Sequence, residues 1–198
     1  MRNYLYSLLL LHFIVLTVMA QSDFEKAANL YNQALELQQK GDDDKALAAY
    51  NQAVLLNPKL VDAYNNRANI KLSRNDQNGA IDDFTKVIEI NPKYPLSYYN
   101  RGIIYQQIGK NDEAIADYTL VIQKMPANHA AINMRGKAYL EKGLNKPALQ
   151  DFEQAIKLQP NNSEYQMNKT RALLRNIKDN QDELKKHGVT PTPLPQKQ

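Results

Sequence analysis

The chain has 198 residues, of which 43% are hydrophobic and 23% are charged, and its net charge is +4 at pH 7. It contains no cysteine, which excludes disulfides, thiol nucleophiles and cysteine-ligated metals. Apart from Arg2, the positive excess comes from residues 163–198, which hold seven basic and four acidic residues. Arg171, Arg175 and Lys178 form a short helical stripe there, which we interpret as a solvated helix face rather than a nucleic-acid footprint. We therefore predict no nucleic-acid partner.

Residues 1–20 have the composition of a secretory signal peptide. Arg2 precedes an apolar run over 8–19, and Val-Met-Ala at 18–20 stands before the expected cleavage site. The apolar run is shorter than the roughly 20 residues that a spanning helix needs. We expect cleavage and export, to the periplasm or the medium. The alternative is a membrane-anchored protein that retains residues 1–20, and membrane contact is expected only in that case.

A period of 34 residues organises the chain after this segment. Four prolines stand 34 residues apart, namely Pro58, Pro92, Pro126 and Pro160. Between them, two amphipathic patterns of helical spacing are separated by a short polar turn, such as residues 109–111. Each proline cannot continue a helix, and it disfavours the helical conformation of the preceding residue. The sequence therefore predicts a repeated unit of two helices.

The residues that recur in each unit resemble the signature of the tetratricopeptide repeat family. That signature runs bulky residue, x2, Leu, Gly, x2, Tyr, then Ala, x3, Phe and a closing Pro. The third unit matches with Tyr98, Arg101, Gly102, Tyr105, Ala114, Tyr118 and Pro126, and the fourth with Ile132, Arg135, Gly136, Tyr139, Ala148, Phe152 and Pro160. The second unit keeps Tyr64, Ala80, Phe84 and Pro92 but has Ala68 for Gly and Lys71 for Tyr; the first keeps Leu30, Ala34, Ala46, Tyr50 and Pro58.

The resemblance implies an all-α fold, a right-handed α-solenoid of helix-turn-helix repeats closed by a capping helix. We expect a repeat domain over 21–162, with four repeats at 27–60, 61–94, 95–128 and 129–162. The small residues Gly102, Gly136, Ala114 and Ala148 are expected to set the distance between paired helices, since larger side chains there would hold the helices apart.

An arginine and an aspartate recur together, sixteen residues apart. The pairs are Arg67 with Asp83, Arg101 with Asp117, and Arg135 with Asp151. In the first unit both are missing, because Gln33 and Ala49 occupy those places. We interpret each pair as a structural ion pair, either within a unit or between neighbouring units, in which the planar guanidinium grips the carboxylate with two hydrogen bonds.

Two capping boxes predict where helices outside the repeats begin. Ser22 with Glu25 would start the first helix directly after the cleavage site, and Ser163 with Gln166 would start a capping helix. The capping helix is expected over 163–188, where basic residues and Gly188 end it. The Thr/Pro/Gln-rich tail at 189–198 is predicted to be disordered.

The resemblance also implies where a partner binds. In this family the first helix of each pair lines a concave groove that holds an extended peptide or a partner helix. Projected onto this sequence, the groove residues are Tyr31, Asn32, Asn65, Asn66, Asn69, Tyr99, Asn100, Gln106, Asn133 and Lys137. Asparagine amides both donate and accept, so such a row can pair with a peptide backbone whatever its side chains are. The alternative interpretation is that these amides have no binding role and are only exposed to solvent on a helix face or hydrogen-bonded to local backbone.

One subtype of the family is excluded by its missing cations. Chaperone-binding members grip a C-terminal carboxylate with two lysines, two asparagines and an arginine. Asn66 matches one asparagine, but Tyr31, Leu35, Leu96 and Asn100 stand where the other four belong. The chain therefore lacks this carboxylate clamp.

No pattern in the sequence indicates catalysis, a metal site or a cofactor. His129 and His187 have no acidic partner nearby in sequence, and His12 lies in the expected signal peptide. The acidic run at 42–44 lacks the alternating spacing of a calcium loop and suits the start of a helix. We predict no enzymatic activity and no small-molecule cofactor.

These observations predict a non-catalytic scaffold that binds a protein or peptide partner in its concave groove, in an extracytoplasmic compartment. Two alternatives stay open. One is a membrane-anchored adaptor, and the other is an accessory subunit that positions a separate enzyme without peptide specificity of its own.

Overall fold

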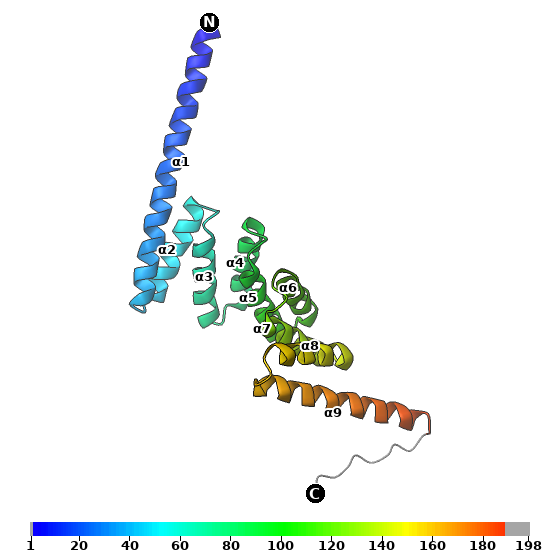
Figure 1. Ribbon diagram of the computed structural model, residues 1–198. Helices are drawn as coiled ribbons and strands as arrows, with labels where there is room; N and C mark the ends of the chain where they lie inside the picture. Colours follow the sequence, from blue (N-terminus) through cyan, green and yellow to red (C-terminus); the bar gives the residue numbers. More distant parts are fainter. Residues whose placement is uncertain (1, 189–198) are drawn as a thin grey trace. The chain divides into compact units, whose positions relative to one another are not determined.

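The computed structural model describes residues 2–188, with side chains described for residues 12, 13, 19 and 21–188. Over this range the secondary structure is entirely helical (Figure 1). The helices are α1 (Arg2–Gln39), α2 (Asp43–Leu56), α3 (Val61–Ser73), α4 (Gln77–Ile90), α5 (Pro95–Gln107), α6 (Asn111–Lys124), α7 (His129–Glu141), α8 (Asn145–Leu158) and α9 (Ser163–Lys186). The predicted all-α fold is confirmed. The tail expected to be disordered, 189–198, lies outside the described residues.

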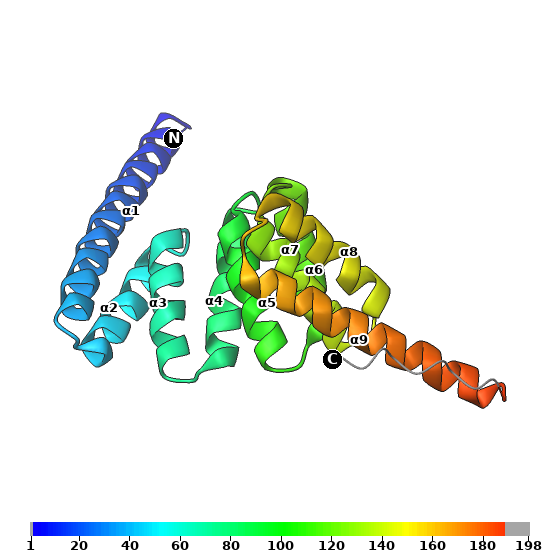
Figure 2. The same cartoon turned by 60° about the horizontal axis from the view of Figure 1, so that its bottom comes forward.

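The chain divides into two compact units after Ser97. In the first unit α1 packs on α2, α2 on α3, and α3 on α4. Its core is built around the fully buried Tyr50, with Ala34 from α1 and Ala63 from α3 against it. The beginning of α1 extends beyond its partner helix in both views (Figures 1 and 2).

In the second unit Tyr99 of α5 packs against Tyr118 of α6, and α6, α7, α8 and α9 follow as successive neighbours. The fully buried Tyr118 and Phe152 fill the space between paired helices. The second half of α9 projects past α8 (Figure 2).

The turn within each helix pair depends on one residue in the left-handed conformation. Gly41, Gly109 and Gly143 have φ between 75° and 78°, and Asn75 takes the equivalent place with φ 61°. Glycine has no Cβ to clash there, and asparagine tolerates this region better than most residues. The acidic run follows the first of these turns, where Asp42 caps α2 by accepting a hydrogen bond from the Lys45 amide.

Two expected helix starts differ from the structure. Ser22 lies inside α1, which runs unbroken from Arg2 to Gln39, so the predicted capping box does not begin a helix in the full chain. The cap of α9 is Asn162, whose side chain accepts a hydrogen bond from the Tyr165 amide, so Ser163 is the first helical residue. The end of α9 is as expected, since Gly188 follows it with φ 74°.

Among the described residues, no helix is both long enough and apolar enough to cross a bilayer.

Small residues allow the close approach of paired helices. A Cβ added at Gly102 would lie 2.9 Å from Cε1 of Tyr118, and one at Gly136 would lie 2.8 Å from Cε1 of Phe152. Ala114 and Ala148 are fully buried on the facing helices. Both rings are themselves fully buried, so an added Cβ would have to displace a side chain of the core.

We predict that Ala114→Leu lowers the free energy of unfolding by about 1–3 kcal/mol, because the larger side chain overpacks the contact between α5 and α6. Ala116→Leu is the matched control, since Ala116 is exposed on the same helix, and it should stay within about 0.5 kcal/mol. Urea denaturation of both variants measures the difference. Equal stabilities for the two variants would contradict the packing described here.

Candidate partner-binding surface

Three buried ion pairs fix the first helix of a repeat onto its second helix. Arg101 donates from Nε and Nη2 to the two carboxylate oxygens of Asp117, both at 2.8 Å. Arg135 grips Asp151 in the same way at 2.9 and 2.8 Å, and Arg67 grips Asp83. The three carboxylates are 2–4% exposed. The pairs predicted from the sixteen-residue spacing are therefore formed within a repeat.

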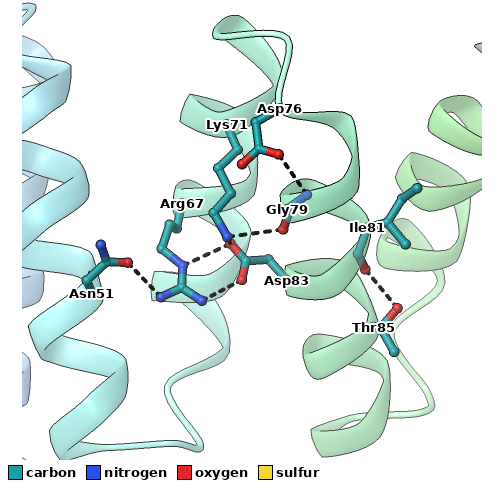
Figure 3. A network of polar contacts seen from close by, with 8 residues as sticks. All are labelled: Asn51, Arg67, Lys71, Asp76, Gly79, Ile81, Asp83 and Thr85. Carbon is teal, nitrogen blue, oxygen red and sulfur yellow. Dashed lines mark hydrogen bonds and ion pairs between the residues drawn. The ribbon is translucent and has the colours of Figure 1, made fainter.

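The same arginines also reach back to the preceding repeat within each unit. Arg67 Nη1 donates to Asn51 of α2 at 2.9 Å, and Arg135 Nη1 donates to Thr119 of α6 at 3.2 Å. Figure 3 shows Arg67 between Asn51 and Asp83. Each of these two arginines thus joins three helices, and this sets the direction in which the first helix presents its other faces.

The second repeat replaces an aromatic contact by a second cation. Tyr105 and Tyr139 lie 5.6 and 5.9 Å from the guanidinium carbons of Arg101 and Arg135, distances typical of cation–π contacts. At the equivalent place Lys71 lies 2.9 Å from Asp83 and donates to the Gly79 carbonyl at 3.1 Å (Figure 3). Lys71 therefore departs from the family signature but still supports the same buried carboxylate.

Burial raises the pKa of the Asp117 carboxyl, while the hydrogen bonds from Arg101 act in the opposite direction. The same hydrogen bonds raise the pKa of Arg101. A carboxylate in this position depends on its partner, because removing the guanidinium would leave a buried charge without compensation.

We expect Arg101→Ala and Asp117→Ala each to lower the free energy of unfolding by about 3–5 kcal/mol, since each leaves the other partner buried and unpaired. The double variant should cost clearly less than the sum of the two losses. Chemical denaturation of the four proteins measures this coupling. The exposed pair Lys86 and Glu89, 2.7 Å apart, is the control and should couple far more weakly. Additive losses at Arg101 and Asp117 would refute the pairing.

In the first unit, the predicted groove residues lie on α1 and α3. The Asn66 side chain donates to the Tyr31 hydroxyl at 3.3 Å, and the Tyr31 ring lies 5.9 Å from the ring of Tyr50. Asn65 is half-buried, whereas Asn32 and Asn69 are exposed. The amides of this unit therefore include one that fixes a tyrosine and two that are accessible to a partner.

In the second unit, Tyr99 and Asn100 are half-buried on α5. The Tyr99 ring lies 6.0 Å from the ring of Tyr118, whose hydroxyl donates to Gln106 at 3.3 Å. Gln106 in turn donates to Glu141 of α7 at 3.1 Å. Gln106 thus links two repeats through its own hydrogen bonds, and Tyr99 remains as the aromatic residue with part of its ring accessible.

Burial raises the pKa of the tyrosines at this surface and of Tyr50 beneath it. It raises the pKa of Tyr31 and of Tyr99, and it raises the pKa of Tyr50 to about 12. At neutral pH these hydroxyls serve as hydrogen-bond donors and acceptors rather than as bases.

The structure places Asn133 in the interior, and this differs from the position expected for a groove residue. Its side-chain oxygen accepts a hydrogen bond from Asn168 of α9 at 2.9 Å, and both residues are buried. Lys137 lies 3.8 Å from Glu164 of the same helix. Helix α9 therefore covers the part of the predicted surface that the fourth repeat was expected to provide. Asn168 was missed, although it falls in the register of Asn32, Asn66 and Asn100, two 34-residue periods after Asn100, with Met134 at the position between them.

Among residues 2–188 no three His, Cys, Asp or Glu side chains are grouped so that they could hold a metal ion. His129 Nδ1 lies 2.7 Å from the hydroxyl of Tyr165. His187 lies 3.3 Å from Glu183, four residues earlier in α9, so the expectation that it has no acidic partner nearby in sequence is wrong.

The fold and these contacts define a helical repeat protein in which, within each unit, neighbouring pairs of helices are tied together. Sequence profiles named TPR repeat match residues 37–72 and 68–109, and profiles named tetratricopeptide repeat match residues 96–123 and 129–162. The chain belongs to the tetratricopeptide repeat family, and the fold is that of a protein–protein interaction scaffold.

Solved structures support the same fold at low sequence identity. A crystal structure of MamA is 24% identical with a TM-score of 0.64, covering 73% of this chain and 84% of its own. A tetratricopeptide repeat protein from Parabacteroides merdae is 20% identical with a TM-score of 0.71, covering 80% and 62%. The first repeat domain of Spaghetti (RPAP3), bound to the HSP90 peptide SRMEEVD, is 24% identical with a TM-score of 0.56, covering 58% and 90%. No curated protein sequence matches the chain.

Proposed function

We propose that the protein is a non-catalytic scaffold that binds an extended segment of a partner protein on the exposed faces of its first helices. The observation that carries this proposal is the repeated combination of a partly accessible tyrosine with asparagine amides. Tyr31, Asn32 and Asn69 provide it in the first unit, and Tyr99 and Asn100 provide it in the second. Asn133 is not part of this surface, because its amide is buried against Asn168.

The chemistry of this surface favours recognition of a peptide backbone. Backbone amides offer alternating donors and acceptors, and an asparagine side chain matches both with its NH2 and its carbonyl oxygen. Tyrosine adds a large apolar area with one polar end, which suits an anchor at an interface. Their pairing on the same helices supports binding over simple solvation.

The peptide-bound domain of Spaghetti (RPAP3) supports a peptide partner in this fold. The acidic terminus of its ligand is not the chemistry that we propose here. The lysines and arginine of the carboxylate clamp are replaced by Tyr31, Leu96 and Asn100 in this chain. The partner segment is therefore proposed to be held through its backbone.

We also propose that the protein acts outside the cytoplasm, after removal of residues 1–20. The composition of this segment supports export. The packing of α1 is compatible with it, because Ala27 is the first of the α1 side chains described to be buried. Cleavage would shorten α1 without removing a described core residue. Retention of the segment would instead give the membrane-anchored adaptor.

Photocrosslinking in the native host tests the binding surface. A photoreactive amino acid at the exposed Asn69 of α3 should give a discrete adduct with a partner, and one at the exposed Lys86 of α4 should not. Both positions lie in the first unit, but only Asn69 lies on the proposed binding surface. Adducts at Lys86 alone, or at neither position, would favour the accessory-subunit alternative.

Sequencing the N-terminus of the protein purified from its host tests the location. We expect the mature chain to begin at Gln21 and to be recovered from the extracytoplasmic fraction. A protein that begins at Met1 and leaves the membrane fraction only with detergent would establish the anchored form.

A further inference from the structure

Helix α9 takes the place of the first helix of a fifth repeat. It begins at Ser163, which is 34 residues after His129, where α7 begins. Lys169 lies 3.0 Å from Glu153, sixteen residues earlier, just as Arg135 bonds to Thr119 sixteen residues earlier. The capping helix is thus packed in the register of the repeats.

The contacts between α9 and α7 show how one first helix covers the previous one. Asn168 donates to Asn133 at 2.9 Å. Arg175 donates from Nη1 to the Leu140 carbonyl at 2.8 Å, and Lys137 lies 3.8 Å from Glu164. An incoming helix therefore brings an amide, a carboxylate in its first turn and a small buried residue, Ala172.

The equivalent face of α9 is uncovered. Residues 34 positions after Asn133, Lys137 and Leu140 are Met167, Arg171 and Leu174. Met167 and Leu174 are 58% and 56% exposed, whereas Ala172 is fully buried. They line one open surface with Thr170, Arg171 and Lys178, which we call the α9 outer face.

The charge of the α9 outer face is positive throughout. Arg171 is exposed and Lys178 is accessible, and no acidic residue lines this surface within the described part of the chain. On α7 the corresponding cation, Lys137, faces Glu164 of the covering helix. The α9 outer face therefore repeats the arrangement of α7, except that no counterpart of Glu164 covers it in the described part of the chain.

We propose that the α9 outer face docks an amphipathic helix of a partner protein with acidic residues in its first turn. A small apolar face of that helix packs on Met167 and Leu174, two large apolar side chains that lie exposed on one surface. A carboxylate of its first turn pairs with Arg171, in the way that Glu164 pairs with Lys137. This site is separate from the surface of tyrosines and asparagines proposed above, and the partner segment here is helical rather than extended.

Residues 189–198 do not have the composition of such a helix. Residues 189–198 contain three prolines and neither aspartate nor glutamate. Proline interrupts a helix, and the segment has no acidic side chain for Arg171. The occupant is therefore a helix of another protein.

A designed peptide tests the proposal with the full chain. The probe is a fluorescein-labelled peptide with the sequence of residues 163–180 carrying Arg171→Glu, Leu174→Gln and Lys178→Glu. It keeps the face with which α9 covers α7 and has an acidic outer side. Fluorescence anisotropy should show saturable binding to the protein. The same peptide with Glu164→Lys should bind at least about tenfold more weakly, since the pair with Arg171 is lost.

Variants of the protein locate the site. Arg171→Glu with Lys178→Glu should weaken probe binding at least about tenfold, and Met167→Ser with Leu174→Ser should do the same. The matched control is Lys146→Glu with Lys157→Glu, which makes the same change in net charge on α8 and should leave binding unchanged. Circular dichroism shows whether each variant keeps its helical content.

Three results would overturn the proposal. One is equal binding of the probe to the Arg171/Lys178 variant and to the control, or no binding at all. Another is self-association of the unmodified protein that the Arg171/Lys178 variant loses, because the occupant would then be a second copy. The third is probe binding only after truncation at Gly188, which would identify the tail as the occupant. None of these results depends on the surface tested by crosslinking at Asn69.

Discussion

The ion pair between Arg101 and Asp117, with its equivalents in the second and fourth repeats, is the interaction on which the arrangement of these three repeats depends. Two parallel hydrogen bonds fix both the distance and the rotation of the first helix on the second. Where the same guanidinium also reaches the preceding repeat, as for Arg67 and Arg135, the angle between repeats is fixed as well. On α3 and α5 the accessible asparagines and Tyr99 lie on first helices that are held in this way.

Much of the fold could be predicted because the repeat period encodes it locally. The prolines at 34-residue spacing mark where helices end, and the co-occurrence of Arg and Asp in the same three units predicted a pair that the structure confirms. A comparison of units within one chain needs no other sequence. Whether the pair lies within a repeat or between repeats could not be decided, because Arg101 stands sixteen residues from Asp117 of its own repeat and eighteen from Asp83 of the preceding one.

The candidate site was harder to predict because burial in the last repeat depends on the helix that comes after it. Asn133 was placed with the other asparagines on the basis of its helix position, yet α9 covers it. Asn168 was the available signal, since it stands two 34-residue periods after Asn100. The start of α1 was missed for a related reason. A capping box at Ser22 predicts a local preference, and a helix that already runs from Arg2 overrides it.

The absence of the pair in the first repeat has a consequence for local unfolding. Gln33 and Ala49 cannot form the link that ties the other first helices down, so α1 is held on α2 mainly by apolar packing around Tyr50. In a repeat array each unit is stabilised by its neighbours, and an end unit has only one. Fraying should therefore begin at the N-terminal pair and proceed toward the fourth repeat. If residues 1–20 stay in a membrane, the helix pair nearest to the bilayer would be the pair that unfolds most readily. A pulling force on the anchor would then act directly on the least stable pair of the array.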